Sequence, residues 1–361
     1  MSDLLTANAG RIGRLKETLR QRNVGALLVV TLANIRYLTG FSGSSGFLLI
    51  SRQGDFFFTD FRYKEQSEAE VSGAEVIITE NDSINFITGF MKEKLGLQDF
   101  FFEDMATFRQ YRQFKKDCEV SPMQDVVEEL RVQKDESEVD LIARAIERAE
   151  CAFKEVRPYI RVGVSEREIA LRLEENLKKA GVRKLPFDTI VASGANSAVV
   201  HAKPTDKTLE AGDLVLIDWG GECEGYCSDM TRTFLLRGGD ISKKCEIYET
   251  VHGANEAGRN GVAPGMTAAE TDALARDFIG KAGYGGCFGH STGHGVGLDV
   301  HEAPYIRSYG IETNLRQGMV FTIEPGIYIS GLGGVRIEDM VCVGANNGKT
   351  LTTLPRELEI L

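Results

Sequence analysis

Cysteine is scarce in this sequence, and its spacing gives no disulfide framework. Seven cysteines occur among 361 residues, and this odd number without regular spacing predicts free thiols rather than a set of bridges. Cys223 and Cys227 form the one close pair. Because no second pair lies nearby, their spacing does not predict a zinc site.

Long apolar runs and an excess of positive charge are also missing. No run approaches the roughly 20 apolar residues that cross a bilayer, and the first residues, MSDLLTANAGRIGRLKE, lack the apolar core of a signal peptide. Lysine and arginine total 42 against 53 acidic residues, a net charge of −11, which does not attract nucleic acids or anionic membranes. We therefore expect a cytoplasmic protein that binds neither nucleic acid nor membrane.

Acidic residues stand inside a strand-like segment that is otherwise apolar. Residues 215–219 and 229–234 have the pattern of a β-hairpin with a short turn rich in Gly and Glu. A turn centred between Cys223 and Glu224 would place Asp218 directly opposite Asp229. Facing carboxylates in an apolar sheet repel each other and lose their water. A cation is therefore expected between them, either a basic side chain, with Arg232 the nearest, or a metal ion.

A second hairpin repeats this arrangement near the end of the chain. Residues 320–329 and 334–343 are strand-like runs joined by a glycine-rich turn. A turn centred on Gly331 places Glu324 opposite Glu338. Two such hairpins can neutralise two divalent cations, and four carboxylates with one imidazole suit metals such as Mn²⁺ or Co²⁺.

The chain is long enough for two domains. Residues 1–125 alternate between helical and strand patterns, with strands expected at 26–30, 56–59, 75–79 and 100–103, and predict an α/β domain with a mixed sheet. A charged, helix-favouring run then marks a boundary near residue 125. Its helix has an apolar face, so we expect it to pack on a second domain, residues 126–361.

The second domain contains a faint internal repeat. Ser165 to Glu168 and Thr267 to Glu270 each have the sequence of a capping box that opens a helix, and each helix ends at a Lys-Ala-Gly sequence. A hairpin with paired acids follows each helix further along the chain. This order predicts pseudo-twofold symmetry with the two hairpins meeting at the axis.

Histidines concentrate near these hairpins. Of the five, only His252 lies in a helical segment away from them, and we expect it to be structural. His290, His294 and His301 lie in GHSTGHGVGLDVHE, which is too rich in glycine for a helix. The glycines indicate that backbone or a ligand passes close by, and three histidines in one such loop predict a functional cluster.

These motifs resemble those of a known family. Four segments resemble, in order and context, the ligand segments of the "pita-bread" metallopeptidases, in particular aminopeptidase P and prolidase. These segments are DWGGECEGYCSDMTRTF, GHSTGHGVGLDVHE, FTIEPGIY and GVRIED. NIRYLTGFSGSSGFLLI and FFFTDFRY resemble the family's creatinase-type N-terminal domain. The resemblance implies a small creatinase-like α/β domain and a pita-bread α+β domain with pseudo-twofold symmetry.

The resemblance also implies roles for individual residues. Asp218 would bind one metal ion, Asp229 and Glu338 would bridge two, and His294 and Glu324 would complete the shell of the other. Four further residues are implied to bind substrate or move protons: His201, His290, His301 and Arg336. For Arg336 the alternative is a charge partner of Asp229 or Glu338.

The implied activity is metal-dependent hydrolysis of the N-terminal Xaa-Pro bond of peptides, as in a Xaa-Pro aminopeptidase, with Glu324 taking a proton from the attacking water. The alternatives are a Xaa-Pro dipeptidase restricted to dipeptides, a creatinase-type hydrolase, and a metal-free binding module. Both of the last two have typically lost the acidic residues that are present here. By resemblance, the implied metals are two Mn²⁺ ions, with Co²⁺, Zn²⁺ or Fe²⁺ as alternatives, and the implied assembly is a homodimer. Tyr37 and Arg62 lie in family-like segments but receive no role.

Overall fold

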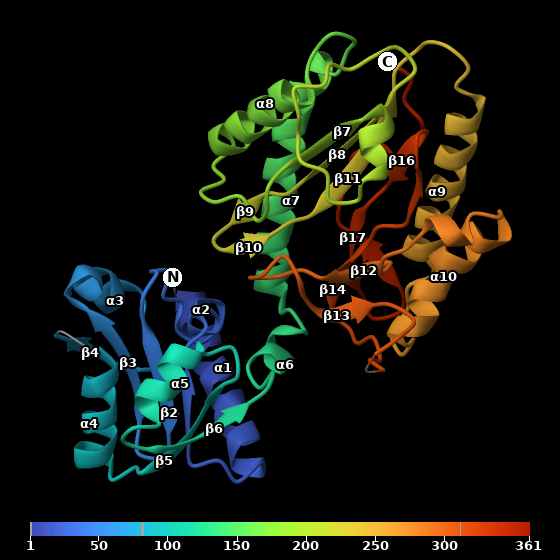
Figure 1. The fold of residues 1–361 in the computed structure, drawn as a ribbon. Helices are drawn as coiled ribbons and strands as arrows, with labels where there is room; N and C mark the ends of the chain where they lie inside the picture. The colour runs from blue at the N-terminus through green and yellow to red at the C-terminus, as the bar shows by residue number, and fades with distance from the viewer. Residues whose placement is uncertain (1, 81–82, 311) are drawn as a thin grey trace. The chain divides into compact units, whose positions relative to one another are not determined.

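The computed structural model describes residues 2–80, 83–310 and 312–361. The chain divides into two compact units, Met1–Arg131 and Val132–Leu361, a few residues after the boundary expected near residue 125 (Figure 1). Within the described ranges, no helix combines the length and the apolar character that a bilayer-crossing segment needs.

The first unit is built on one mixed sheet of six strands. Its strand order is β4-β3-β2-β1-β5-β6, in which the β1/β2 and β2/β3 pairs are antiparallel and the other pairs are parallel. This confirms the predicted α/β class, and the four strands expected from the sequence are β1, β3, β4 and β5. The elements are α1 (Ser2–Gln21), β1 (Ala26–Val29), α2 (Leu32–Thr39), β2 (Phe47–Ser51), β3 (Asp55–Asp60), η1 (Phe61–Tyr63), α3 (Lys64–Glu70), β4 (Glu75–Thr79), α4 (Ser83–Leu95), β5 (Asp99–Glu103), α5 (Phe108–Phe114), β6 (Glu119–Met123) and α6 (Glu128–Arg131).

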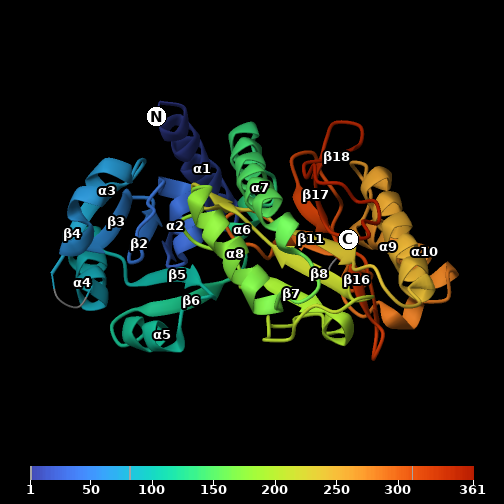
Figure 2. The same ribbon diagram turned by 90° about the horizontal axis from the view of Figure 1, so that it is seen from above.

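The second unit has two pairs of long helices with antiparallel sheets between them. Its helices are α7 (Glu136–Val156), η2 (Arg157–Tyr159), α8 (Glu166–Lys179), η3 (Gly194–Ala198), α9 (Ser242–Gly261), α10 (Ala268–Lys281) and η4 (Gly285–Cys287). Its strands are β7 (Ile190–Ser193), β8 (Leu214–Trp219), β9 (Glu222–Cys223), β10 (Tyr226–Cys227), β11 (Met230–Leu235), β12 (Gly293–Gly295), β13 (Glu302–Ile306), β14 (Val320–Ile323), β15 (Gly326–Ile329), β16 (Gly333–Arg336), β17 (Asp339–Val343) and β18 (Gly348–Thr350). The larger sheets have the orders β11-β8-β7 and β13-β12-β14-β17-β18. In Figures 1 and 2, α7 and α8 flank these strands on one side, and α9 and α10 flank them on the other.

The first half of this unit contains the elements from α7 to β11, and the second half contains those from α9 to β18. The two halves repeat the same local structure, as the sequence predicts. Ser165 caps α8 and Thr267 caps α10, each accepting the backbone N–H three residues on, and at Thr267 the capping box is complete. Ser165 also forms a β-bridge with Thr208, and Thr267 forms the corresponding bridge with Asn314. The repeated caps and bridges support the pseudo-twofold relation. Glycines with positive φ stand before and after the two helices: Gly163, Gly181, Gly265 and Gly283.

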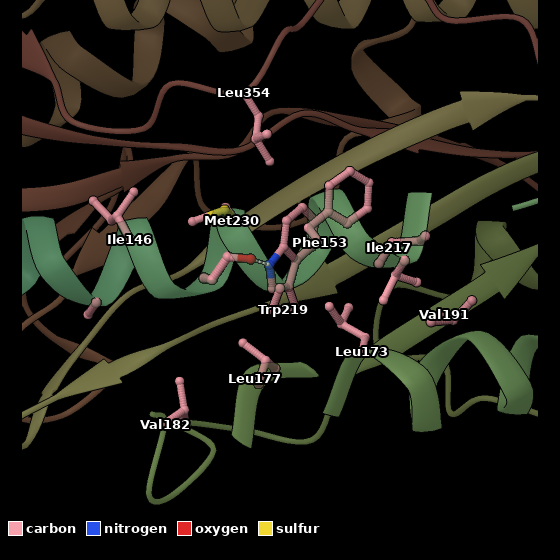
Figure 3. Close-up of a cluster of buried hydrophobic side chains, with 14 of the residues drawn as sticks. Ile146, Phe153, Leu173, Leu177, Val182, Val191, Ile217, Trp219, Met230 and Leu354 are labelled. Carbon is pink, nitrogen blue, oxygen red and sulfur yellow. Dashed lines mark hydrogen bonds between the residues drawn. The ribbon is translucent and has the colours of Figure 1, made fainter. Parts of the chain in front are cut away.

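The apolar core between α7, α8 and the β8/β11 pair fixes the strand that carries Asp218. Trp219 is fully buried, its ring stacks on Phe153 with 4.5 Å between centroids, and its Nε1 donates to the Ala149 carbonyl at 3.0 Å. Ile217 enters the same cluster (Figure 3). Because side chains alternate along a strand, Asp218, between these two residues, points to the opposite face.

Candidate metal centre

The first hairpin has a register that differs from the one expected. Glu224 and Gly225 both have positive φ, 48° and 83°, as a two-residue type I′ turn requires. The turn is therefore centred between them, and Asp218 pairs with Thr231. The prediction that Asp218 directly opposes Asp229 is wrong. Asp229 nevertheless lies two residues from Thr231, so both acids face the same side of the sheet.

The basic residue near the acids is also not the one expected. Arg232 lies on the opposite face of β11, where its guanidinium pairs with Asp339 at 2.8 Å. Arg336 instead contacts the cluster, with its Nη2 2.5 Å from Asp218 Oδ2. Arg232 is therefore no counter-ion for Asp218 and Asp229. Arg336 forms its ion pair with Asp218, and its charge also lowers the pKa of Asp229 and Glu338, in line with the alternative role.

The second hairpin has the predicted register. Ile323 pairs with Asp339 on one side of a break in the strands, and Gly326 pairs with Arg336 on the other. This common register puts Glu324 across from Glu338 in the break. Glu338 also forms an isolated bridge with Thr231, which joins the second hairpin to the first.

His294 completes the cluster from β12. Its Nε2 lies 3.6 Å from Asp229 Oδ2 and 3.5 Å from Glu324 Oε1. Its Nδ1 lies 3.2 Å from the Gly295 carbonyl, which favours a proton on Nδ1 and leaves Nε2 free to bind a metal ion. Ligand atoms lie within 4.8 Å of one another in two groups that together contain all five predicted ligands: Asp218, Asp229 and Glu338; and His294, Glu324 and Glu338.

Close backbone packing brings His294 to this position. A Cβ atom on Gly293 would lie 1.8 Å from the Thr322 carbonyl oxygen, and one on Gly295 would lie 2.2 Å from that of Ala303. Only glycine fits such approaches. For Gly293 and Gly295 this confirms the expected close passage of backbone, whereas Gly297 lies against the Glu302 side chain.

The charges of the cluster call for cations. Burial raises the pKa of Asp229, Glu324 and Glu338, and neighbouring carboxylates raise it further, with Asp218 acting on all three. Asp218 Oδ1 is buried and receives no hydrogen bond from any described residue. An oxygen-rich set with one imidazole and an unsatisfied carboxylate oxygen fits hard to borderline divalent metals.

The other predicted residues lie around the same centre. His290 Nε2 hydrogen-bonds to Tyr328 OH at 2.9 Å, and its carbonyl accepts from Arg276, which pairs with Asp272 on α10. The His301 ring lies 4.3 Å from the His294 ring. All nine residues proposed from the sequence line one cavity of about 730 Å³: His201, Asp218, Asp229, His290, His294, His301, Glu324, Arg336 and Glu338.

Sequence reasoning missed two side chains that organise this cavity. The Tyr328 hydroxyl accepts from Arg336 Nη1 at 3.0 Å as well as contacting His290. Thr231 Oγ1 donates to Glu338 Oε2 at 2.7 Å and accepts from Arg336 Nε at 3.1 Å. Strand alternation could have placed Thr231 beside Asp229, whereas the Tyr328 contacts depend on the tertiary fold.

Comparison with known proteins gives two family matches. Residues 140–345 match "Metallopeptidase family M24", and residues 11–133 match "Creatinase/Prolidase N-terminal domain". Together the two matches span most of the chain.

Relatives match over nearly the full length of both chains. A Xaa-Pro dipeptidase from Pyrococcus horikoshii is 37% identical over 96% of this chain and 98% of its own. The solved structure of a Xaa-Pro dipeptidase from Bacillus anthracis is 40% identical, with a TM-score of 0.94 over 98% of this chain and 100% of its own. The solved structure of an X-Pro aminopeptidase from Thermotoga maritima is 36% identical, with a TM-score of 0.87 over 97% of this chain and 99% of its own.

Proposed function

Because the chain belongs to metallopeptidase family M24, we propose that it is a Xaa-Pro dipeptidase that hydrolyses dipeptides with proline in the second position. The sequence alone favoured a Xaa-Pro aminopeptidase, with the dipeptidase as the alternative. The relatives named as dipeptidases favour that alternative. The aminopeptidase remains the second candidate, because one similar solved structure carries that name.

The distribution of charge in the cavity carries this proposal. Four carboxylates gather at the candidate metal centre, and Lys203 and Arg307 are among the cationic residues of the wall. Arg307 is held by aromatic rings, with its guanidinium carbon 5.1 Å from the Tyr305 centroid and 4.8 Å from that of Tyr309. A dipeptide has one ammonium and one carboxylate group. We propose that the ammonium group binds beside the acids and that Arg307 binds the carboxylate that follows proline.

The five predicted ligands would hold a dinuclear centre, which we propose contains Mn²⁺. When bound, two divalent ions there would lower the pKa of a water molecule and polarise the scissile carbonyl. Glu324 would accept the proton of the attacking water at its carboxylate. This role is supported by the raised pKa of Glu324, caused first by burial, because a higher pKa makes a carboxylate a stronger base.

Histidines would complete the proton transfer. The proline nitrogen must be protonated to leave as an amine, and we assign that donation to His201 or His301, both in the cavity wall. Burial and the neighbouring His294 lower the pKa of His301, which makes its protonated imidazole a stronger proton donor. His290 and Arg336 would orient the substrate, and we propose a homodimer as the assembly.

The test compares peptides of different length on metal-stripped enzyme given Mn²⁺, Co²⁺ or Zn²⁺ separately. A Xaa-Pro dipeptide should be hydrolysed at least about 100-fold faster, in kcat/KM, than the matching Xaa-Pro-Yaa tripeptide or a dipeptide without proline. Equal rates for dipeptide and tripeptide would favour the aminopeptidase. Protein that binds no metal and hydrolyses neither peptide would favour a binding module.

The variant Arg307→Ala tests carboxylate recognition. It should raise KM for the dipeptide about tenfold or more, because a charge-assisted hydrogen bond contributes about 1.5–3 kcal/mol, and leave KM for a dipeptide amide nearly unchanged. The Arg167→Ala variant is the control, because this cavity arginine is already paired with Asp206 at 2.7 Å. Equal effects of the two substitutions would contradict the assignment.

A further inference from the structure

The candidate metal centre lies across a seam between the two halves of the second unit. Asp229 immediately precedes β11 in the first half, and Glu338 immediately precedes β17 in the second. Between these two acids the backbones of the halves meet at an isolated bridge, in which the Glu338 N–H donates to the Thr231 carbonyl at 3.1 Å. The spacing of Asp229 and Glu338, which we propose bridge the two ions, therefore depends on what holds this seam.

Arg232 holds the seam from the face opposite the cavity. The residue is only 2% exposed, and its Nη1 donates to the carbonyls of Thr231, at 2.9 Å, and Glu338, at 2.7 Å. One nitrogen thus binds both strands at their point of contact. A guanidinium group can do this because its N–H donors form a rigid, planar fork.

The rest of the guanidinium group is fixed as well. Nη2 donates to Asp339 Oδ1 at 2.8 Å and to the Leu354 carbonyl at 3.0 Å, and Nε donates to the Pro355 carbonyl at 2.9 Å. Asp339 directly follows Glu338 in the second half, and Leu354 and Pro355 lie in the segment after β18. The fork therefore cannot shift without breaking buried hydrogen bonds on several sides, which would leave buried carbonyls unsatisfied and destabilise the fold.

We propose that Arg232 is a positioning residue that sets the distance between the carboxylates of Asp229 and Glu338, and thereby the affinity for the pair of metal ions. This inference rests on the proposed metal centre. It assigns no contact between Arg232 and substrate or metal, because strand alternation turns its side chain away from the cavity.

The test pairs Arg232→Lys with Arg356→Lys. Arg356 donates to Asp339 at 2.9 Å through both Nε and Nη2 and to the Thr352 carbonyl at 2.8 Å, so it shares the buried aspartate but has no hydrogen bond to Thr231 or Glu338. Each substitution keeps a cation and removes the fork. A merely structural role would therefore predict similar effects from the two.

Metal-free proteins are titrated with Mn²⁺ by calorimetry, and unfolding is measured in urea. We expect Arg232→Lys to weaken Mn²⁺ binding about 10- to 100-fold, the range for residues that support metal ligands. Arg356→Lys should change it less than about threefold, although both variants lose stability. Equal Mn²⁺ affinities, or affinities that fall in parallel with stability in both variants, would overturn the proposal. Wild-type protein that binds no Mn²⁺ would overturn the proposed metal centre as well.

A milder change keeps the test decisive if the Arg232→Lys variant does not fold. Thr233 Oγ1 donates to the Arg336 carbonyl at 2.9 Å and accepts from the Arg336 N–H at 3.2 Å, which also joins β11 to the second half. Thr233→Val removes both bonds with little change in shape. Weaker Mn²⁺ binding in this variant would support control of affinity by the seam, and unchanged binding would overturn it.

Discussion

Replacing Asp229 with asparagine should separate metal binding from folding. Asp229 has its Oδ2 3.6 Å from His294 Nε2 and also belongs to the group formed with Asp218 and Glu338. When ionised, the four acids and Arg336 carry four negative charges against one positive, a net of −3. Asp229→Asn changes this to −2 and removes a ligand. We expect at least about a 100-fold loss of Mn²⁺ affinity, which is about 2.7 kcal/mol, and no measurable turnover.

In metal-free protein the same change should stabilise the fold. The pKa of Asp229 is raised above its ordinary value of 3.8, first by burial and then by Asp218 and Glu324. A raised folded-state pKa means that the folded protein binds this proton more tightly, so stability falls as pH rises from about 4 through the raised pKa. Asparagine has no such proton. At pH 8 the metal-free variant should therefore be more stable than metal-free wild type by about 1–3 kcal/mol, and this advantage should shrink towards pH 4.

Urea unfolding of chelator-treated protein at pH 5 and pH 8 measures the stability, and Mn²⁺ calorimetry and dipeptide hydrolysis measure the site. The exchange Asp188→Asn provides the control, since Asp188 lines the cavity outside the acid cluster. Normal hydrolysis by the Asp229→Asn variant would refute the ligand assignment. A stability advantage that shrinks as pH rises would refute the electrostatic reasoning.

Three further predictions concern neighbouring contacts. Thr231→Val removes the hydroxyl that donates to Glu338 Oε2 at 2.7 Å, and it should lower Mn²⁺ affinity in calorimetry about tenfold. Trp219→Phe leaves the buried Ala149 carbonyl without its 3.0 Å donor; urea unfolding should show a loss of about 1–3 kcal/mol, with Mn²⁺ affinity unchanged. Adding Mn²⁺ at 1,000 times its dissociation constant to metal-free wild type should stabilise it by about 4 kcal/mol, measurable as a higher unfolding temperature.

The strand pattern and the order of the acidic residues predict much of the site, but not the first hairpin's register. Regular spacing suggested a turn between Cys223 and Glu224, whereas the chain turns one residue later because Glu224 takes a positive φ of 48°. Positive φ is uncommon for glutamate, so composition gives little warning of it. Moving the turn by one residue moves each cross-strand partner by two. Because side chains alternate with period two, Asp218 and Asp229 still share a face.

Contacts between the halves could not be predicted in the same way. Alternation shows which face Arg336 occupies, but its partner Asp218 lies 118 positions earlier in the chain. Their meeting depends on how the two halves dock. The same limit applies to Tyr328, whose hydroxyl joins His290 to Arg336.

Neither half of the second unit carries a complete set of ligands, so metal binding and the seam should be coupled. Asp218 and Asp229 come from the first half, and His294, Glu324 and Glu338 come from the second. If Arg232 acts only by spacing Asp229 from Glu338, it has nothing to position once Asp229 is replaced. The Arg232→Lys exchange should then weaken Mn²⁺ binding about 10- to 100-fold in wild type, but by less than about threefold in the Asp229→Asn background. Calorimetry on the four proteins of this double-mutant cycle measures the difference. Additive losses in affinity would mean that Arg232 acts on the metal centre by some route other than this pair of carboxylates.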